Sequence, residues 1–488
     1  ITEMTQKIIF WLDSSLTLTF VAKCIKDTTD SQLFSIVDCT QKNTSFFKKQ
    51  TDAIFDKQWF LHSSISKHSE IDYEFLKKME ESYQLNLWTL AINERIFHKY
   101  NQFHKFTSDE ILLILQNECK FFENVLDECK PDFFITYESA LHYQEIFYLM
   151  CKKRNVKILM LNQAPIGNRC YISSEYGKFS NGMINNLAST NTSSENSLLK
   201  QLTSYRDNLA NQNFNLLKSF LKLLFSKNDE NKINFSYFGH TKINIFFKYL
   251  ALHLKLRSRN NFINSNLEKN PSTDIDYIYF PLHMEPERSL LIAAPYFTNQ
   301  LEFITSLAKS IPIEFKLFVK EHPSQLLREW RPISYYKELL SIPNVEVIHP
   351  DFDNTQLIKN SKLVITIGGS TGYEALVNNK PCISLVDMEY SKFPGVEKLE
   401  NISDLPKLIK KSLTKELTSS DSKELYEHYF NNTFIFDNFG MESLIDNEFF
   451  NNGTLRDVEI DQSVFDSFFE NHTKTFNDLA EMFVKNIK

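Results

Sequence analysis

The chain has 488 residues, a formal net charge of −7 and 42% hydrophobic residues, a length that suggests two or three domains. This apolar content fills a packed core and excludes an intrinsically disordered protein, and the weakly acidic charge argues against nucleic-acid binding, which usually needs a basic face. The seven cysteines form no CxxC pair, which is typical of reduced thiols in a cytosolic protein and argues against structural zinc.

The N-terminal apolar run is short and is interrupted by Asp13, so it does not predict a signal peptide. No stretch of the sequence reaches the roughly 20 apolar residues that a membrane-spanning helix needs. We therefore expect a cytoplasmic protein.

Strands and helices alternate over the first 170 residues. Short apolar runs predict strands at 7–13, 31–38, 132–139 and 157–165. Periodic apolar positions predict helices at 73–99, 107–130 and 141–155. Strands separated by helices of this length indicate a parallel sheet that is covered on both faces.

The composition changes after residue 180. Residues 185–197 are polar and of low complexity, and helical patterns follow at 198–226 and 243–259. The second of these is apolar and then basic, which fits either a buried helix with a solvated end or a helix lying on a membrane surface. Residues 259–274 are polar and rich in asparagine, which predicts a linker and a domain boundary.

A second alternating series follows this linker. Strands are predicted at 276–283, 314–323, 344–350, 362–369 and 381–387. Helices are predicted at 299–311, 334–342, 354–361 and 370–379. The order is Rossmann-like, but GxGxxG is absent after the first strand of either half, which argues against a dinucleotide enzyme.

The fold class predicted from this order is α/β, with two Rossmann-like domains facing across a cleft, the GT-B layout. The predicted units are 1–270 with a helical insertion at about 180–260, 275–400, and a helical C-terminal segment at 401–488. Ligands of open α/β folds bind at the carboxyl ends of the strands, so we expect the site in the cleft.

Three of the ten glycines fall within five positions, in VITIGGSTGYEAL (364–376). The pattern predicts a strand-to-helix turn whose backbone can approach an anion, with the helix dipole favouring negative charge. A tightly packed helix start explains the glycines as well. The predicted anion-binding residues are Gly369, Ser370, Thr371 and Gly372. Glu374, one turn later, either accepts from a ribose hydroxyl or is an ordinary acid of the first helical turn.

Two further loops follow predicted strands of the second series. In FVKEHPSQ (318–325), His322 can donate to a phosphate oxygen and Lys320 supplies charge, beside Glu321 and Pro323. An ordinary surface loop is the alternative.

In YFPLHMEPERS (279–289), Arg288 can pair with phosphate, and His283 or Glu285 can transfer a proton. A hinge cluster of ion pairs explains this stretch as well.

A base that deprotonates an acceptor hydroxyl is best sought at the strand ends of the first half. Glu138 is the first candidate, followed by His142 and Asp13. The NER stretch (93–95) is interpreted as a helix-borne ion pair. No DxD motif stands out as a metal site, because DFD (351–353) lies in a polar loop before a helix.

YFPLHMEPE, VKEHPS and VITIGGSTGYEALVNNKPCISL occur in this order and resemble the capsule and surface polysaccharide biosynthesis family of GT-B glycosyltransferases. YQLNLWTLAINER (83–95) fits the same group, and the resemblance covers roughly 75–160 and 275–390. The insertion at 180–270 and the tail after 390 are not matched. The family often has Ser or Gly-Thr where this chain has Gly369-Ser370-Thr371.

The resemblance implies that His322–Pro323 and Ser370–Thr371 bind the nucleotide phosphate of a donor. It implies a glycosyltransferase that uses a nucleotide-sugar and acts on a surface glycan of capsular or lipopolysaccharide type. With the scattered cysteines and no evident DxD motif, we expect a cytoplasmic, metal-independent enzyme with no further cofactor. CMP, UDP and GDP remain open as the nucleotide, and peripheral membrane association is compatible. A non-catalytic glycan- or nucleotide-binding module and a sugar-nucleotide 2-epimerase are the alternatives.

Overall fold

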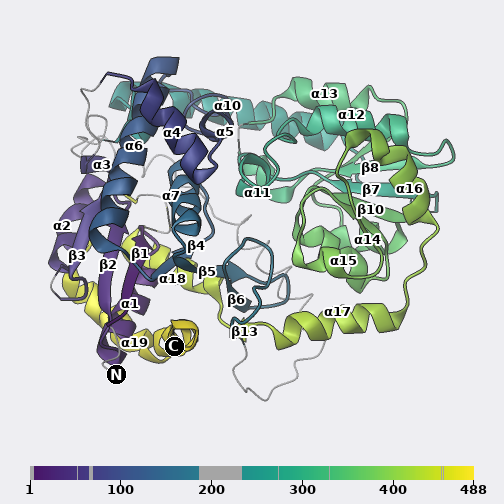
Figure 1. The fold of residues 1–488 in the computed structure, drawn as a ribbon. Coiled ribbons are helices and arrows are strands. Elements are labelled where there is room, and N and C mark those ends of the chain that lie inside the picture. Colours follow the sequence, from purple (N-terminus) through teal and green to yellow (C-terminus); the bar gives the residue numbers. More distant parts are fainter. Residues whose placement is uncertain are drawn as a thin grey trace.

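The computed structural model describes residues 5–51, 53–64, 70–185, 234–272, 274–328, 330–451, 453 and 456–487. They form two α/β domains, each built on one sheet, which Figure 1 shows side by side. The predicted fold class is confirmed. The predictions at 185–197 and 198–226, and much of the proposed helical insertion at about 180–260, lie outside the described residues.

The first sheet has seven strands in the order β13-β6-β5-β4-β1-β2-β3, of which β1 to β5 are parallel. β6 and β13 run antiparallel at one edge. The bounds are β1 Lys7–Leu12, β2 Gln32–Val37, β3 Lys57–Phe60, β4 Phe133–Tyr137, β5 Lys157–Gln163, β6 Arg169–Ser173 and β13 Phe434–Ile435. The four predicted strands are present. β3, β6 and β13 were not predicted, because strands of two to five residues carry little periodicity.

Helices cover both faces of this sheet. On one face lie α1 Thr17–Thr28 and α2 Gln41–Lys49. On the other lie α3 Leu61–Ser64, α4 Tyr73–Tyr83, α5 Leu87–Asn93, α6 Ser108–Cys129 and α7 His142–Lys153. The prediction of α6 is confirmed, with a capping box formed by Thr107 and Glu110.

The single helix predicted at 73–99 is wrong. Gln84 ends α4 in the left-handed conformation, with φ of 55°. Asn86 then begins α5, because its side chain accepts a hydrogen bond from the Thr89 N–H at 3.0 Å.

The second sheet is entirely parallel, in the order β12-β11-β10-β7-β8-β9. Its strands are β7 Tyr277–Pro281, β8 Lys316–Lys320, β9 Val345–Ile348, β10 Leu363–Thr366, β11 Cys382–Ser384 and β12 Val396–Lys398. Its helices are α11 Arg288–Leu291, α12 Gln300–Ser310, α13 Ile333–Leu340, α14 Asn354–Asn360, α15 Ser370–Val377 and α16 Leu405–Leu413. Its 3₁₀ turns are η3 Pro323–Leu327, η4 Glu389–Lys392 and η5 Ile402–Asp404, whereas η2 Phe235–Tyr237 packs on the core of the first domain. Only β12 was not predicted among these strands.

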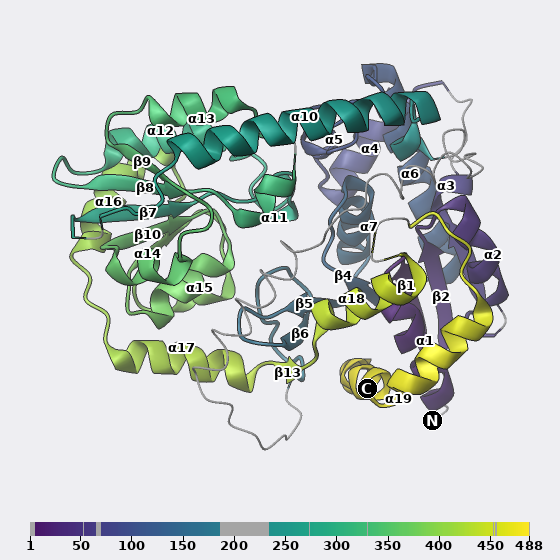
Figure 2. The same cartoon turned by 180° about the vertical axis from the view of Figure 1, so that it is seen from behind.

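Two helices join the domains at opposite ends of the molecule, as Figures 1 and 2 show. They are α10 Lys242–Asn266 and α17 Ser419–Asn431. The linker predicted at 259–274 is therefore wrong over its first half, since α10 continues to Asn266. Beyond it, the Glu268 N–H donates to the Val347 carbonyl at 2.9 Å and extends the edge of β9.

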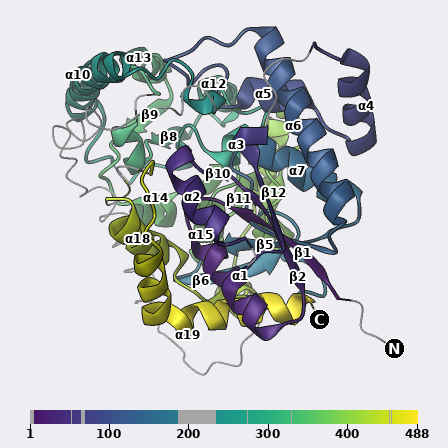
Figure 3. The same ribbon diagram turned by 90° about the vertical axis from the view of Figure 1, so that its left-hand side faces the viewer.

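The C-terminal segment returns to the first domain. It adds β13 to the first sheet, and α18 Asn438–Phe449 and α19 Gln462–Ile487 complete the core. The Phe20 ring of α1 stacks on Phe465 and Phe476 of α19, with centroids 4.4 and 4.5 Å apart. Figure 3 shows α19 lying along α1. The first domain is thus built from both ends of the chain.

This packing makes α19 necessary for the stability of the first domain. We expect Phe465→Ala to lower the unfolding free energy by about 3–5 kcal/mol, because it leaves a cavity in a stacked aromatic cluster. Chemical denaturation measures the change. Phe247→Ala, at an exposed phenylalanine of α10, should change stability by less than about 0.5 kcal/mol. Equal stability of both variants would contradict the assignment of α19 to the core.

Candidate active site

Each sheet has a switch point where the strand order reverses, between β1 and β4 in the first and between β7 and β10 in the second. Ligands of open α/β sheets bind at such points, beyond the carboxyl ends of the strands. Asp13 and Glu138 follow β1 and β4. His283 and Gly369 follow β7 and β10. Several predicted site residues therefore lie at the two switch points.

An interdomain cluster of Glu138, Tyr176, Glu287 and Arg288 joins the two domains near these points. The Arg288 guanidinium lies over the Tyr176 ring, 3.9 Å from its centroid. Glu138 is solvent-accessible, but the surrounding protein reduces its hydration and raises its pKa, which the charge of Arg288 partly offsets. Burial also raises the pKa of Glu287, and the Glu138 carboxylate adds to that effect. Two carboxyl groups and one guanidinium thus share this boundary.

Arg288 has hydrogen-bonding capacity that the protein does not use. Its Nε and Nη1 atoms are buried and have no hydrogen-bond partner. A buried donor left without a partner costs about 1–3 kcal/mol, and guanidinium groups match the geometry of phosphate. An anion bound beside Tyr176 would satisfy both groups.

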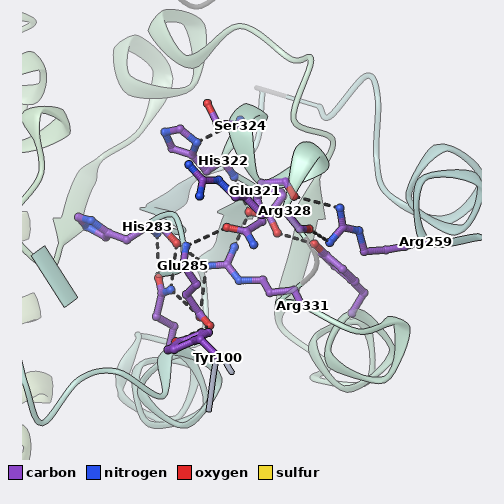
Figure 4. Close-up of polar contacts among 12 residues, drawn as sticks. Tyr100, Arg259, His283, Glu285, Glu321, His322, Ser324, Arg328 and Arg331 are labelled. Atoms are coloured by element: carbon purple, nitrogen blue, oxygen red, sulfur yellow. Dashed lines mark hydrogen bonds and ion pairs between the residues drawn. The ribbon is translucent and has the colours of Figure 1, made fainter. Parts of the chain in front are cut away.

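The His-Pro loop is held in a defined conformation at the end of β8. The Nδ1 atom of His322 accepts a hydrogen bond from the Ser324 N–H at 3.2 Å, which puts the proton of a neutral ring on Nε2. Arg259 of α10 donates to the carbonyls of Gln325 and Leu326 at 3.0 and 2.8 Å and also to that of Arg328 (Figure 4). The connecting helix thereby fixes the turn that carries His322.

Glu285 and Glu321, two predicted site residues, lie in a buried ion cluster. Arg331 pairs with both carboxylates, at 3.4 Å from Glu285 and closer to Glu321 (Figure 4). Tyr336 donates to Glu321 at 2.6 Å, and Lys99 of the first domain pairs with Glu285 at 3.1 Å. The structure therefore gives both carboxylates a role in holding the loops together, rather than an open position toward a ligand.

His283 packs against the glycine turn. Its Nε2 atom lies 3.2 Å from the Thr366 hydroxyl, and a Cβ atom built on Gly369 would come within 3.0 Å of its ring. Burial and the charge of Arg331 lower its pKa to about 4, so the ring is neutral at physiological pH. A neutral buried ring suits a hydrogen-bonding role.

The other two glycines of the turn also have packing partners. A Cβ atom on Gly368 would lie 2.8 Å from Val386, and one on Gly372 would lie 2.5 Å from the Tyr390 ring. Close packing therefore explains the glycines without a ligand. Ser370 and Thr371 begin α15 at this turn, and Ser370 is exposed.

Glu374 and Lys320 have neighbours within the second domain. Glu374 accepts from the Ser370 hydroxyl at 3.0 Å and from the Asn354 amide at 3.1 Å. Lys320 is buried; burial lowers the pKa of His349, Asp351 opposes this, and the charges of Lys269 and then Lys320 add to the lowering. His349 borders a pocket of about 340 Å³ whose other lining residues are Asn264, Lys269, Asp351, Phe352, Asp353 and Gln356.

His142 lies inside the first domain, between two buried carboxylates. Its Nδ1 atom is 2.9 Å from Glu94, and its Nε2 atom is 3.1 Å from Glu118. Burial alone would lower its pKa, but these carboxylates outweigh it and raise the pKa to about 10. A protonated ring whose two nitrogens both bond to carboxylates has no free nitrogen to accept a proton. The geometry of His142 therefore indicates a structural role and does not support its prediction as a base.

The NER stretch carries the ion pair that the sequence suggested, but the main partner of Glu94 is His142. Arg95 donates to the Ala140 carbonyl at 2.7 Å, and its Nε atom is 3.7 Å from Glu94. Asn93 donates to the carbonyls of Leu291 and Pro295 in the second domain. The stretch therefore contributes to the domain contact.

Asp13 belongs to a different group of charges. Its carboxylate accepts from the Ser15 N–H at 2.9 Å, and burial raises its pKa. The charges that act on it are those of Asp38 and Arg456. The structure does not bring Asp13 together with the interdomain cluster.

Sequence reasoning did not select Tyr176 or Arg331. Tyr176 follows β6, an antiparallel strand that was not predicted, so no motif marked it. Arg331 precedes a proline in an unremarkable polar stretch, and nothing in the sequence indicates that its side chain is buried. The one available signal is general: a buried charged residue needs a partner, so the carboxylates of the neighbouring loops could have prompted a search for a cation such as Arg331.

A family model described as "Capsule polysaccharide biosynthesis protein" matches residues 189–434. The chain belongs to the capsule polysaccharide biosynthesis family. This confirms the resemblance seen in the sequence and supports the function predicted with it, a glycosyltransferase of surface-glycan synthesis. The match also takes in 189–270 and 391–434, which sequence motifs did not assign, whereas the YQLNLWTLAINER stretch lies outside it.

Solved structures of low similarity include a UDP-GlcNAc 2-epimerase from Methanocaldococcus jannaschii, with 15% identity over 88% of this chain and 99% of that chain, at a TM-score of 0.24. Another is the beta Kdo 2,7 transferase KpsC from Thermosulfurimonas dismutans, with 14% identity over 70% and 87% of the two chains, at a TM-score of 0.30. No curated protein matches this chain. Likenesses this weak carry no argument about its activity.

The charged state of His142 makes stability depend on pH. The unfolded chain releases this proton near pH 6.5, whereas the folded chain holds it to about pH 10. The stabilisation that His142 adds to the unfolding free energy is therefore complete below about pH 6.5. Above that pH it declines, by up to about 1.4 kcal/mol per pH unit. We expect thermal unfolding temperatures to fall more steeply with rising pH in the wild type than in His142→Gln.

The exposed His98 provides the control, because His98→Gln should keep the wild-type slope. Parallel curves for the wild type and His142→Gln would show that no proton is held between the two carboxylates.

Proposed function

We propose that this capsule-family protein is a GT-B glycosyltransferase that moves a sugar from a nucleotide-sugar to a growing surface glycan of capsular or lipopolysaccharide type. One observation supports it above the others: two guanidinium nitrogens of Arg288, Nε and Nη1, are buried without a hydrogen-bond partner near the two switch points. This is the environment in which a donor phosphate gains most from a guanidinium, because competing water is scarce.

The second domain is proposed to bind the donor. As the sugar transfers, negative charge grows on the departing phosphate. Arg288 and the Nε2–H of His322 would donate to that phosphate, and Ser370 and Thr371 would offer the amide groups of a helix start. Lys320 adds positive charge behind them. These groups would take the place of a metal ion in neutralising the leaving group.

The first domain is proposed to supply the base. Glu138 lies at the end of β4, and its pKa is raised toward the range in which a carboxylate accepts a proton efficiently. It would deprotonate the acceptor hydroxyl as that oxygen attacks the sugar. The nearby Arg288 links this carboxylate to the phosphate site.

The proposed substrates are a nucleotide-sugar, with CMP as one candidate nucleotide, and a glycan acceptor. No cofactor or nucleic acid takes part in the proposed reaction. We place the enzyme in the cytoplasm, at the inner face of the membrane where a growing surface glycan is assembled.

Nucleotide binding tests the phosphate site. We expect one of CMP, UDP and GDP to raise the thermal unfolding temperature of the wild type, because a ligand of the folded state stabilises it. Arg288→Ala and His322→Ala should each weaken that binding about 10- to 100-fold, the loss of a charge-assisted hydrogen bond. Lys309→Ala, at an exposed lysine of α12, is the control. Wild-type-like binding by both variants would locate the phosphate elsewhere.

Turnover tests the base. We expect Glu138→Gln to lower kcat by about 10²- to 10⁴-fold without weakening nucleotide binding. In the wild type, activity should fall as the pH drops below the raised pKa of Glu138, since only the carboxylate accepts the proton. Nucleotide release from a panel of nucleotide-sugars and glycan acceptors is the measurement.

Asp13→Asn is the matched control, and a loss in that variant alone would reassign the base. Conversion of a UDP-sugar without any acceptor would identify a 2-epimerase instead. Nucleotide binding with no turnover across the panel would identify a non-catalytic binding module.

A further inference from the structure

The connecting helix α10 has two apolar faces. Its inner face carries the buried Ile245 and Ile263, together with the buried Arg259 that bonds the His-Pro loop. A second set of apolar side chains lies about half a helical turn away, on the outer face. An ordinary surface helix has one apolar stripe and a polar opposite side.

The outer stripe consists of Ile243, Phe247, Leu250 and Leu254, spaced as i, i+4, i+7 and i+11. These residues are 69%, 62%, 51% and 61% exposed. The spacing keeps all four on one side of the helix over about three turns. Four large apolar side chains in one exposed row cost solubility, and such patches mark interaction sites.

Positive charge borders this stripe. Arg257 lies beside the stripe toward the second domain, while Lys248 and Lys255 on one side and Lys242 on the other lie about a third of a turn around the helix from it. α10 contains no aspartate or glutamate in its 25 residues. The helix is thus a cationic stretch in a protein whose net charge is −7.

We propose that the outer stripe of α10 docks the protein on the surface of an anionic phospholipid membrane. Ile243, Phe247, Leu250 and Leu254 would enter the boundary between headgroups and acyl chains, and the flanking lysines would meet the lipid phosphates. Charge complementarity favours an anionic membrane as the partner, because α10 combines exposed apolar residues with lysines and arginines and has no acidic residue.

A second copy of the chain fits this stripe poorly. Packing two α10 helices together would bring lysines and arginines against one another without a single acid on either helix. The overall negative charge of the protein does not prevent membrane docking, because screening limits its effect to within about 10 Å of the surface. Among the described residues, no helix is long and apolar enough to cross a bilayer.

Docking through α10 would set the orientation of the molecule. α10 bridges both domains along one side, as Figure 2 shows, so both would be held at the membrane surface together. This deepens the membrane-associated role within the proposed function. It does not depend on the transfer reaction, because binding to vesicles is measured without turnover.

Vesicle co-sedimentation tests the proposal. We expect the full chain to bind vesicles of phosphatidylcholine with about 30% phosphatidylglycerol, and to bind pure phosphatidylcholine at least about tenfold more weakly. Phe247→Ser with Leu254→Ser should weaken binding to the anionic vesicles by about 100-fold. Lys248→Gln with Lys255→Gln should weaken it by about 25-fold, and added salt should act in the same direction.

Tyr296→Ser with Ile313→Ser is the matched control, because these apolar residues are 81% and 102% exposed but lie outside α10. It should bind like the wild type, and all variants should keep the wild-type thermal unfolding temperature and nucleotide-binding profile. Absence of wild-type binding, or equal loss in the control, overturns the proposal. A dimer that dissociates in Phe247→Ser with Leu254→Ser would assign the stripe to self-association. A lowered unfolding temperature in that variant would show that the chain itself covers the stripe.

Discussion

The second domain depends on one buried cation. Arg331 is about 1% exposed and is held between the carboxylates of Glu285 and Glu321, and it also donates to the His283 carbonyl. It thereby ties the loop after β7 to the loop after β8. Breaking a buried pair by removing one partner typically costs about 3–5 kcal/mol, because the remaining charge stays unpaired. The positions of His283 and His322 rest on this arginine, although it contacts neither imidazole ring in the hydrogen bonds described.

The same cluster reaches into the first domain. Lys99 and Tyr100 bond to Glu285 at 3.1 and 3.2 Å, and the Tyr100 ring meets Trp330 edge-on. On the far side of the boundary, Lys178 pairs with Asp387 at 2.7 Å. These polar contacts therefore fix the position of the second sheet relative to the first. This matters for the proposed reaction, which takes a carboxylate from one domain and a phosphate site from the other, because small misplacements slow such reactions strongly.

The sequence was sufficient for the architecture and insufficient for the site. Buried parallel strands are continuous apolar runs, so the Rossmann-like order could be predicted from them; β13 could not, because it consists of Phe434 and Ile435 alone and exists only through its partner strand. The predicted strand ends placed Glu138 and His283 near the two switch points, and the loop after β7 leads to Arg288 at the start of α11. Sequence motifs could not show that Glu285 is buried beside Arg331, since these two residues are 46 positions apart in the chain.

The chain passes from the first domain through α10 to the second sheet and returns through α17 to the first sheet, where β13 pairs with β6. Connections at both ends of the molecule oppose sliding and twisting of one domain against the other. They leave rotation about the line that joins α10 and α17, which is a hinge motion of the two halves. A cut in either connection would still leave the halves joined through the other.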